Sequence, residues 1–423
     1  MKLNLFTNIT RNRIAEPLSF VIPILIGIFI FVNPFPHITA IKEITFYLSV
    51  GLFFILILLR PTEYSFQSPL SLPFVLFILW SFTGLFFALN KQNSIHDFIV
   101  HLLKYIVYYY ILINFFRTRK HFLVLTWLVI ISSVIFAASI IIYYYGIIGN
   151  SLQARLGVTM EQIQINLINS VTVFASLLAL FGFFANARFY LKIFFFFSFC
   201  ITILTSLLTQ TRSAMLALLT GIIILFFNQK KILIGLFSVL ILLLAITPIK
   251  DRITGDAFFH DARISTNLVT WEIIKDYPVF GIGFGMQTYD DSNFLRPYYE
   301  KLPIEYRHEP LIGHPHNLFM DTAVRTGLIG LMLFFYLIVN TFRMGRNILC
   351  SGHNPFFRSW GRCLIAAFVA VIIQGMLEPT LFGPPAIVLY TILGMMTILW
   401  RLQQAETNES HSVTEKGQTG LKL

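Results

Sequence analysis

The sequence predicts an all-α polytopic membrane protein with about 12 transmembrane helices and one long extracytoplasmic loop containing short helices. The chain is 56% hydrophobic and only 12% charged, whereas soluble domains carry about 25% charged residues. Its 45 phenylalanines are more than the core of one water-soluble domain can hide, but lipid can solvate them. Long apolar runs recur along the chain between short polar segments, as in proteins that cross a bilayer many times.

Each candidate span is a run of about 16 to 25 mainly apolar residues, long enough to cross the hydrocarbon region as a helix. The twelve runs are 17–33, 44–59, 70–89, 98–116, 122–147, 167–185, 190–208, 213–228, 231–247, 318–341, 360–377 and 384–400. Basic residues precede the first run, as in a signal peptide. No small-residue cleavage site follows that run, so we expect an uncleaved first helix.

Basic residues predict the orientation, because Lys and Arg accumulate in cytoplasmic loops. An even number of spans places both termini on one side. If that side is the cytoplasm, the short outer loops hold only Lys42, Lys91, Arg155 and Arg212. The inner segments then hold eighteen basic residues: Lys2, Arg11, Arg13, Arg60, Arg117, Arg119, Lys120, Arg188, Lys192, Lys230, Lys231, Arg343, Arg346, Arg358, Arg362, Arg401, Lys416 and Lys422. We therefore expect cytoplasmic termini, and this bias explains the net charge of +11 without a nucleic-acid partner.

One connection, residues 248–316, is far longer than the other predicted loops, and loops of this length are usually functional. Within 251–276, Ile264, Leu268, Trp271 and Ile274 recur at helical spacing, which predicts an amphipathic helix on the membrane face. The expected organisation has four parts: spans one to nine in 1–247, the loop in 248–316, spans ten to twelve in 317–400, and a polar, disordered cytoplasmic tail in 401–423.

Four cationic side chains on the outer side are candidates for anion binding. Arg212 lies in TQTRS where the eighth span begins, and a helix N-terminus adds unpaired N–H groups to its charge. Arg263 is a candidate for a second phosphate group, but pairing with Asp261 or contact with lipid phosphate explains it equally well. Arg155, and Lys104 about 9 Å below the outer end of span four, are weaker candidates. Snorkelling toward lipid headgroups is the structural alternative for Arg212 and Lys104.

The segment that closes the long loop carries two histidines. His316 lies just before the tenth span, at the end of the long loop. A histidine at this position can remove a proton from a hydroxyl group near neutral pH. His314 and Asn317 are supporting candidates.

Other patterns carry weaker signals. A metal site is not expected, because His314 and His316 lack the i, i+4 spacing of a helical ligand pair. Adjacent acids in a polar loop are usually solvated, and the three cysteines have no metal-ligand or disulfide spacing. The glycines follow no strand and precede no lysine, so they predict a turn and no nucleotide fold. The other possible metal ligands near the two histidines are His308, Glu309 and Asp321, and the adjacent acids are Asp290 and Asp291. The cysteines are Cys200, Cys350 and Cys363, and the glycines are Gly281, Gly283 and Gly285.

Four motifs, in this order, resemble the O-antigen ligase and O-antigen polymerase superfamily of bacterial envelope proteins. They are TQTRS at 209–213, DARISTNLVTWEII at 261–274, DYPVFGIGFG at 276–285 and HPHNLFMDTAVRTGLIGL at 314–331. The region that holds them spans about a quarter of the chain, and the rest is similar only in its expected topology.

The resemblance implies a multi-pass glycosyltransferase of the bacterial inner membrane with its active site facing the periplasm. The donor would be a glycan on undecaprenyl diphosphate, and the acceptor of a ligase a sugar hydroxyl of lipid A–core. By carry-over onto the matching motifs, Arg212 and Arg263 would bind the diphosphate and His316 would be the essential histidine. The family ligase chemistry is inverting and metal-independent and needs no cofactor.

Two alternatives stay open at this point. O-antigen polymerases, which join undecaprenyl-diphosphate-linked repeat units, share the motifs; the ligase is preferred because the length of the chain suits a ligase. A solute transporter is the alternative from another class, since twelve spans are common there. Transporters tend to have paired repeats and ionisable groups near the midplane, whereas nearly all the charge here lies outside the predicted spans. The sequence does not indicate the donor sugar, the acceptor hydroxyl or the oligomeric state.

Overall fold

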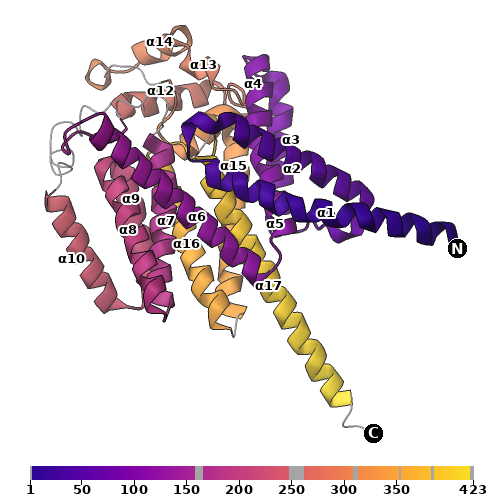
Figure 1. Ribbon diagram of the computed structural model, residues 1–423. Coiled ribbons are helices and arrows are strands. Elements are labelled where there is room, and N and C mark those ends of the chain that lie inside the picture. The colour runs from indigo at the N-terminus through magenta and orange to yellow at the C-terminus, as the bar shows by residue number, and fades with distance from the viewer. Residues whose placement is uncertain are drawn as a thin grey trace.

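A computed structural model describes residues 2–157, 165–246, 262–307, 313–351, 354–382 and 385–419, and every regular element in these ranges is a helix. The long helices form one bundle (Figure 1). They are α1 (Lys2–Val32), α2 (Thr39–Leu59), α3 (Ser71–Gly84), α5 (Lys104–Phe115), α6 (Arg119–Ile141), α7 (Ile165–Ala185), α8 (Phe189–Leu208), α9 (Arg212–Phe226), α10 (Lys230–Ile246), α15 (Leu318–Ser351), α16 (Pro355–Gly375) and α17 (Ala386–Thr419). The short elements are η1 (Pro36–Ile38), η2 (Pro61–Glu63), η3 (Leu85–Phe87), α4 (Lys91–Asp97), η4 (Phe98–Leu103), η5 (Ile142–Ile147), α12 (Ala262–Asp276), α13 (Gln287–Asp290), α14 (Ser292–Glu300) and η7 (Ile304–Tyr306).

All twelve predicted runs coincide with helices, so the prediction of an all-α polytopic membrane protein is confirmed. Within the described ranges, nine helices are long and apolar enough to cross a bilayer, and the count of twelve is not confirmed. The short ones are α3, α9 and α10, with 14, 15 and 17 residues. A helix of 15 residues is about 22 Å long, less than the roughly 30 Å of the hydrocarbon region.

Helix α7 is the centre of the bundle. Every residue from Leu167 to Gly182 is buried, and α6, α8, α9 and α16 pack around it. Its polar side chains pair across to α8: Thr172 Oγ1 lies 2.7 Å from Ser206 Oγ, and Ser176 Oγ donates to Thr202 Oγ1 at 2.8 Å. Such pairs satisfy hydroxyl groups that neither lipid nor a helix backbone alone would satisfy. Helix α7 is therefore buried on all sides between Leu167 and Gly182.

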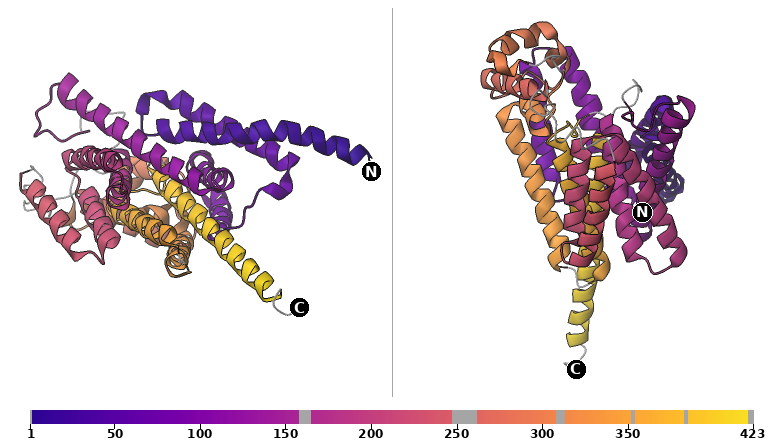
Figure 2. Two further views of the ribbon diagram at one scale, coloured as in Figure 1. Left: turned by 60° about the horizontal axis from the view of Figure 1, so that its bottom comes forward. Right: turned by 90° about the vertical axis from the view of Figure 1, so that its left-hand side faces the viewer.

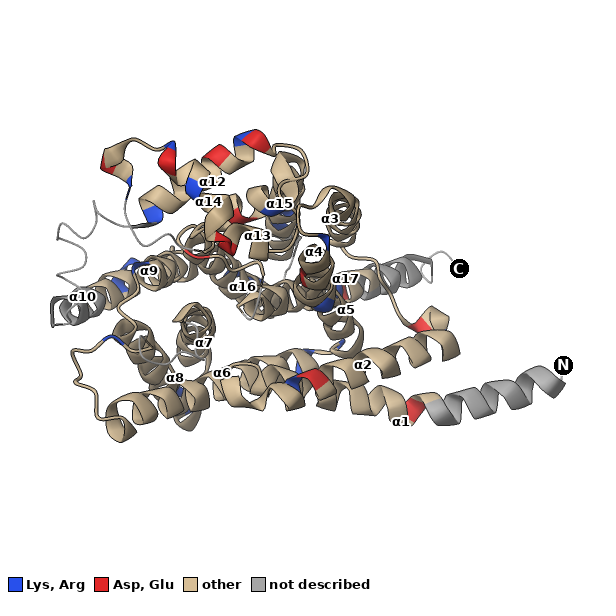
Figure 3. Cartoon of the chain, turned by 90° about the horizontal axis from the view of Figure 1, so that it is seen from above, with Lys and Arg blue, Asp and Glu red and all other residues tan. Residues whose placement is uncertain are grey.

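Helices α12, α13 and α14 lie together at the end of the bundle opposite the C-terminus, hereafter the loop end (Figures 1 and 2). Seen from this side, acidic and basic residues gather on and around α12 and α14, whereas most of the bundle is free of charge (Figure 3). The described part of the long loop from 262 to 307 therefore forms a folded cap at this end.

The predicted loop helix is present as α12, and one of its faces packs within the fold. Val269 and Ile273 are buried against α14 and α15, whereas Trp271 of the predicted membrane face is 48% exposed. Ile274 of the predicted face is buried as well, so α12 packs within the fold through residues both inside and outside that face. Residues 251–261 of the predicted helix lie outside the described ranges.

The glycine-rich segment after α12 packs tightly against α15. Gly281 has φ +69° and Gly327 has φ +73°, a backbone region that favours glycine. A Cβ on Gly281 would lie 2.3 Å from the carbonyl oxygen of Val324, and one on Gly327 would lie 1.8 Å from that of Val279. These glycines therefore allow two backbones to touch, which positions the chain that follows α12.

Helix α17 continues beyond Arg401, where the sequence predicts a disordered tail. Gln403 donates a 3.2 Å hydrogen bond to the carbonyl of Ile348, and Asn354 donates a 3.0 Å bond to Glu406. Gln, Ala and Glu after Arg401 favour helix, and these bonds hold the helix against α15 and the turn before α16. The prediction of disorder from Arg401 is therefore wrong for the first turns of the tail.

Candidate functional site

A buried carboxylate gathers four distant segments at the loop end. Glu378 lies between α16 and α17 and is 3% exposed. Its Oε1 accepts a hydrogen bond from Arg263 of α12, and its Oε2 lies 2.9 Å from Nδ1 of His316 and 2.9 Å from Nδ2 of Asn166 of α7. Two of the three residues that the sequence predicts as the core of the site therefore meet on one acid.

The electrostatics of this group determine which atoms carry protons. Burial raises the pKa of the Glu378 carboxyl, but the hydrogen bond from His316 and the charges of His316 and Arg263 outweigh it, so the pKa lies below its ordinary value. An ionised carboxylate only accepts hydrogen bonds, so Nδ1 of His316 carries the proton. In the neutral ring Nε2 is then the nitrogen with a free lone pair, which suits a general base.

The histidine is held in place by its neighbours. Asn317 accepts hydrogen bonds from the N–H groups of Phe319 and Met320 and so caps α15, while its Nδ2 donates to the carbonyl of Met376 at 3.0 Å. This single side chain ties the start of α15 to the segment that carries Glu378.

The ring of His314 lies 4.6 Å from that of His316, measured between centroids. Burial, and then the proximity of His316, lower the pKa of His314, so His314 is neutral near pH 7.

His314, His316 and Glu378 each offer a metal-ligand atom, and these atoms lie within 4.8 Å of one another. Glu378 already accepts from three donors, and the positive charge of Arg263 beside it opposes a cation. The arrangement therefore favours a hydrogen-bonded acid–histidine pair. Of the other metal candidates, Asp291 caps α14 by accepting from the N–H of Asn293 at 2.9 Å. His308 and Glu309 lie outside the described ranges.

Arg212 is the first residue of α9 and follows a tight turn. Gln210 in that turn has φ +50°, which is uncommon outside glycine. Thr209 donates a 2.8 Å hydrogen bond to Asn169, which lies one turn of α7 below Asn166. Arg212 is therefore at the loop end, on a turn joined through α7 to the Glu378 group.

Polar atoms near this turn have unused hydrogen-bonding capacity. Nδ2 of Asn169 and Oγ of Ser213 are buried and have no partner among the described residues. Oε1 of Gln374 and Oγ1 of Thr380, both close in sequence to Glu378, are in the same condition. Buried polar groups are normally satisfied, so this end of the bundle is suited to a polar ligand.

The two weaker cationic candidates have structural partners. Arg155 donates from Nε to the carbonyl of Thr209 at 2.8 Å and so supports the turn before Arg212. Lys104 forms an ion pair with Glu43 of α2 at 2.6 Å. These contacts favour a supporting role for Arg155. They also favour a structural role for Lys104, as the partner of Glu43.

A second buried charge group stabilises the loop end around Arg325 of α15. Its Nε donates to Asp321 at 3.1 Å, its Nη1 donates to the carbonyl of Phe284 at 2.6 Å and lies 3.8 Å from Asp97 Oδ2. Its guanidinium also lies over the ring of Phe382, 4.7 Å from the centroid. Arg325 thus contacts the glycine-rich segment after α12, the α4 helix and the segment that follows Glu378.

Sequence reasoning missed Glu378, Asn166 and Arg325. Arg325 lies inside the predicted tenth span, and an ionisable residue within a span is a functional candidate by default, so that signal was available. Glu378 directly follows the predicted eleventh span, where counting only basic residues overlooks an acid. Asn166 precedes the predicted sixth span and carries no comparable signal.

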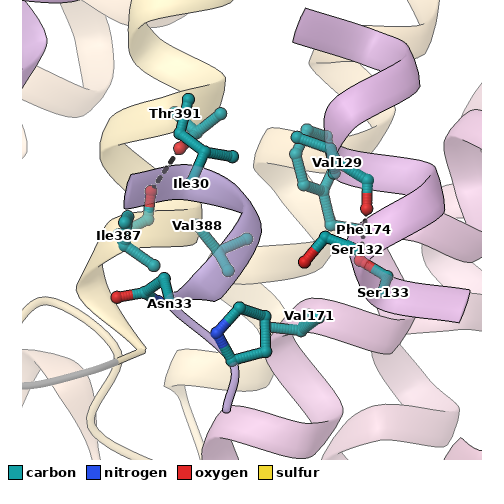
Figure 4. A pocket seen from close by; sticks show the side chains of 11 residues that line it. Ile30, Asn33, Val129, Ser132, Ser133, Val171, Phe174, Ile387, Val388 and Thr391 are labelled. Carbon is teal, nitrogen blue, oxygen red and sulfur yellow. Dashed lines mark hydrogen bonds between the residues drawn. The ribbon is translucent and has the colours of Figure 1, made fainter. Parts of the chain in front are cut away.

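A small cavity between α1, α6, α7 and α17 is not a substrate site (Figure 4). Its volume is about 30 Å³, enough for one or two waters. Nδ2 of Asn33, which lines it, is buried without a partner among the described residues. A sugar or a diphosphate would not fit.

Comparison with known proteins supports the resemblance. A family model described as O-antigen ligase matches residues 193–335. No curated protein matches the chain. The matched region contains Arg212, Arg263, His316 and Arg325, whereas Glu378 lies outside it.

Proposed function

We propose that the chain is an O-antigen ligase, because residues 193–335 match a family model of that description and the chain is a multi-pass membrane protein. It transfers a glycan from undecaprenyl diphosphate to a sugar hydroxyl of lipid A–core. The reaction takes place at the periplasmic face of the inner membrane, which is where the loop end lies in this proposal. The observation that carries it is the bridging of Arg263 and His316 by Glu378.

The proposed reaction is a single displacement. The acceptor hydroxyl oxygen bonds to the anomeric carbon of the donor as the bond from that carbon to the diphosphate oxygen breaks. Nε2 of His316 takes the hydroxyl proton, and the diphosphate leaves with the bonding electron pair. Attack opposite the leaving group inverts the configuration at the anomeric carbon.

Each charge in the group has a use in this step. The imidazolium that forms on His316 is stabilised by the Glu378 carboxylate at 2.9 Å, as in other acid–histidine pairs. An arginine has five N–H donors, so Arg263 can bind Glu378 and still donate to the diphosphate. Arg212 supplies a second positive charge at a helix N-terminus. Fixed charges of this kind stabilise the leaving group without reorganisation.

The test uses the purified full-length protein in lipid vesicles with an undecaprenyl-diphosphate-linked glycan and lipid A–core. We expect His316→Ala to lower the rate by about 10²–10⁴-fold, as for loss of a general base. Arg212→Ala and Arg263→Ala should reduce the rate strongly as well. Exposed Arg296→Ala on α14 is the matched control. Full activity of both Arg212→Ala and His316→Ala would contradict the proposal.

The acceptor is tested separately, by the lipopolysaccharide gel pattern of a strain that lacks the protein. Loss of a ligase leaves bare core and unattached lipid-linked polymer. Core capped by a single repeat unit would instead identify the protein as an O-antigen polymerase.

A further inference from the structure

A large cavity lies at the end of the bundle remote from Glu378. Its volume is about 470 Å³, and residues of α6, α7, α8 and α16 line it. Helix α7 passes both places: Asn166 binds Glu378, and Leu178 is the first α7 residue to line the cavity. Twelve residues of helix correspond to about 18 Å. The cavity is therefore separate from the candidate active site.

Aromatic side chains form stable walls around the cavity. Trp127 packs on Phe195 with centroids 5.2 Å apart, and Phe181 packs on Trp360 at 4.6 Å. The ring of Phe195 fills the space beside Gly182, because a Cβ added to this glycine would lie 2.7 Å from that ring. A volume of this size falls in the range of about 300–1,000 Å³ that is typical of ligand pockets. Because most of the lining residues are apolar, a hydrocarbon chain is the fitting occupant.

The four helices that line the cavity carry basic residues and no acidic ones. Helices α6, α7, α8 and α16 contain no Asp or Glu. Five basic residues lie within three positions of lining residues: Lys120, Arg188, Lys192, Arg358 and Arg362. A sixth, Arg119, lies over the ring of the lining residue Phe356 and forms an ion pair with Glu406. Basic pockets between transmembrane helices bind anionic headgroups.

We propose that this cavity binds an anionic phospholipid, with one acyl chain between the aromatic walls and the phosphate against the surrounding basic residues. Basic residues alone would reflect only the topology of the chain. Their combination with an acyl-sized apolar cavity indicates a lipid that is recognised by both its chain and its charge. The inference does not depend on the proposed transferase activity.

The test is quenching of tryptophan fluorescence by lipids with brominated acyl chains, with full-length protein in nanodiscs. Bromine quenches only tryptophans near the chain, and Trp127 and Trp360 line the cavity. Brominated phosphatidylglycerol should quench more than brominated phosphatidylcholine at the same mole fraction. This excess should be lost in the Trp127→Phe, Trp360→Phe double variant. It should persist in Trp271→Phe, which changes a tryptophan at the loop end.

The charges are tested by Arg188→Gln and Lys192→Gln. About 1 kcal/mol per basic residue corresponds to about fivefold weaker apparent binding for each lost charge. Arg296→Gln at the loop end is the control. Equal quenching by the two lipids, or none by either, would overturn the proposal. So would displacement of phosphatidylglycerol by undecaprenyl phosphate, since the occupant would then be the carrier lipid.

Discussion

Nδ1 of His316 lies 2.9 Å from Oε2 of Glu378, although the two residues are 62 positions apart in the chain. The carboxylate fixes the orientation and the tautomer of the imidazole ring. Because the same carboxylate binds Arg263, a change at this one residue should affect both the base and the cation.

Glu378→Gln should reduce the transfer rate by about 10²–10⁴-fold, because the neutral amide cannot stabilise the imidazolium of His316. The variant keeps the size of the side chain, so the protein should still fold. The measurement is the rate of glycan transfer at saturating donor. Glu305→Gln, at an exposed position of η7, is the control. Wild-type rates in Glu378→Gln would show that the acid has no part in the reaction.

The loop end should become less stable as the pH falls below about 6.5, the ordinary pKa of histidine. The pKa of His314 is lowered in the folded protein, first by burial. Between the folded and the unfolded pKa the unfolded chain binds more protons, so stability rises with pH in this window. Thermal unfolding midpoints measured from pH 7 to pH 5 should therefore fall.

His314→Gln should weaken this dependence, since it removes the titrating group. An equally steep fall in the variant would assign the effect to another group.

At lower pH a second dependence should follow from Glu378. The pKa of its carboxyl is depressed in the folded protein although burial alone would raise it. The contribution of this carboxylate to stability is present above the ordinary pKa of about 4.3 and is lost as the pH falls through the folded value. The slope of the unfolding midpoint below pH 4.3 should thus be smaller in Glu378→Gln than in the wild type.

Arg325→Met should destabilise the protein by about 3–5 kcal/mol, because it leaves the buried Asp321 carboxylate without its charge partner. The measurement is unfolding by heat or denaturant in detergent. Arg346→Met, at an exposed position of the same helix, should have little effect. Equal stability of the two variants would contradict the role assigned to Arg325.

Gly327→Ala should destabilise the loop end, since the new Cβ would lie 1.8 Å from the carbonyl oxygen of Val279 and φ is positive. Gly51→Ala is the matched control, because a Cβ there meets nothing within 4 Å. Replacing glycine by alanine within a helix, as in Gly51→Ala, should stabilise the protein by about 0.5–1 kcal/mol. Limited proteolysis of the loop can compare the two. Protection of Gly327→Ala at the wild-type level would contradict the prediction.

The local pattern of apolar residues was enough to predict the helical membrane class, because crossing a bilayer requires a run of about 20 apolar residues whatever the rest of the chain does. Short motifs likewise indicated Arg212, Arg263 and His316, whose positions outside the predicted spans can be read without coordinates. The same local reading did not single out Val269 and Ile273, which α12 buries, and it predicted disorder after Arg401, because it cannot include the neighbouring helices.

Only the tertiary structure decided that Glu378 joins Arg263 to His316, and that Arg325 binds the carbonyl of Phe284 and lies close to Asp97. Glu378, Arg263 and His316 come from separate segments of the chain, as do Arg325 and Phe284, and a buried charge is stable only where folding brings its counter-charge and hydrogen-bond donors to it. Which helices become neighbours depends on packing over the whole bundle. The residues of the site could therefore be proposed one at a time, but their assembly could not.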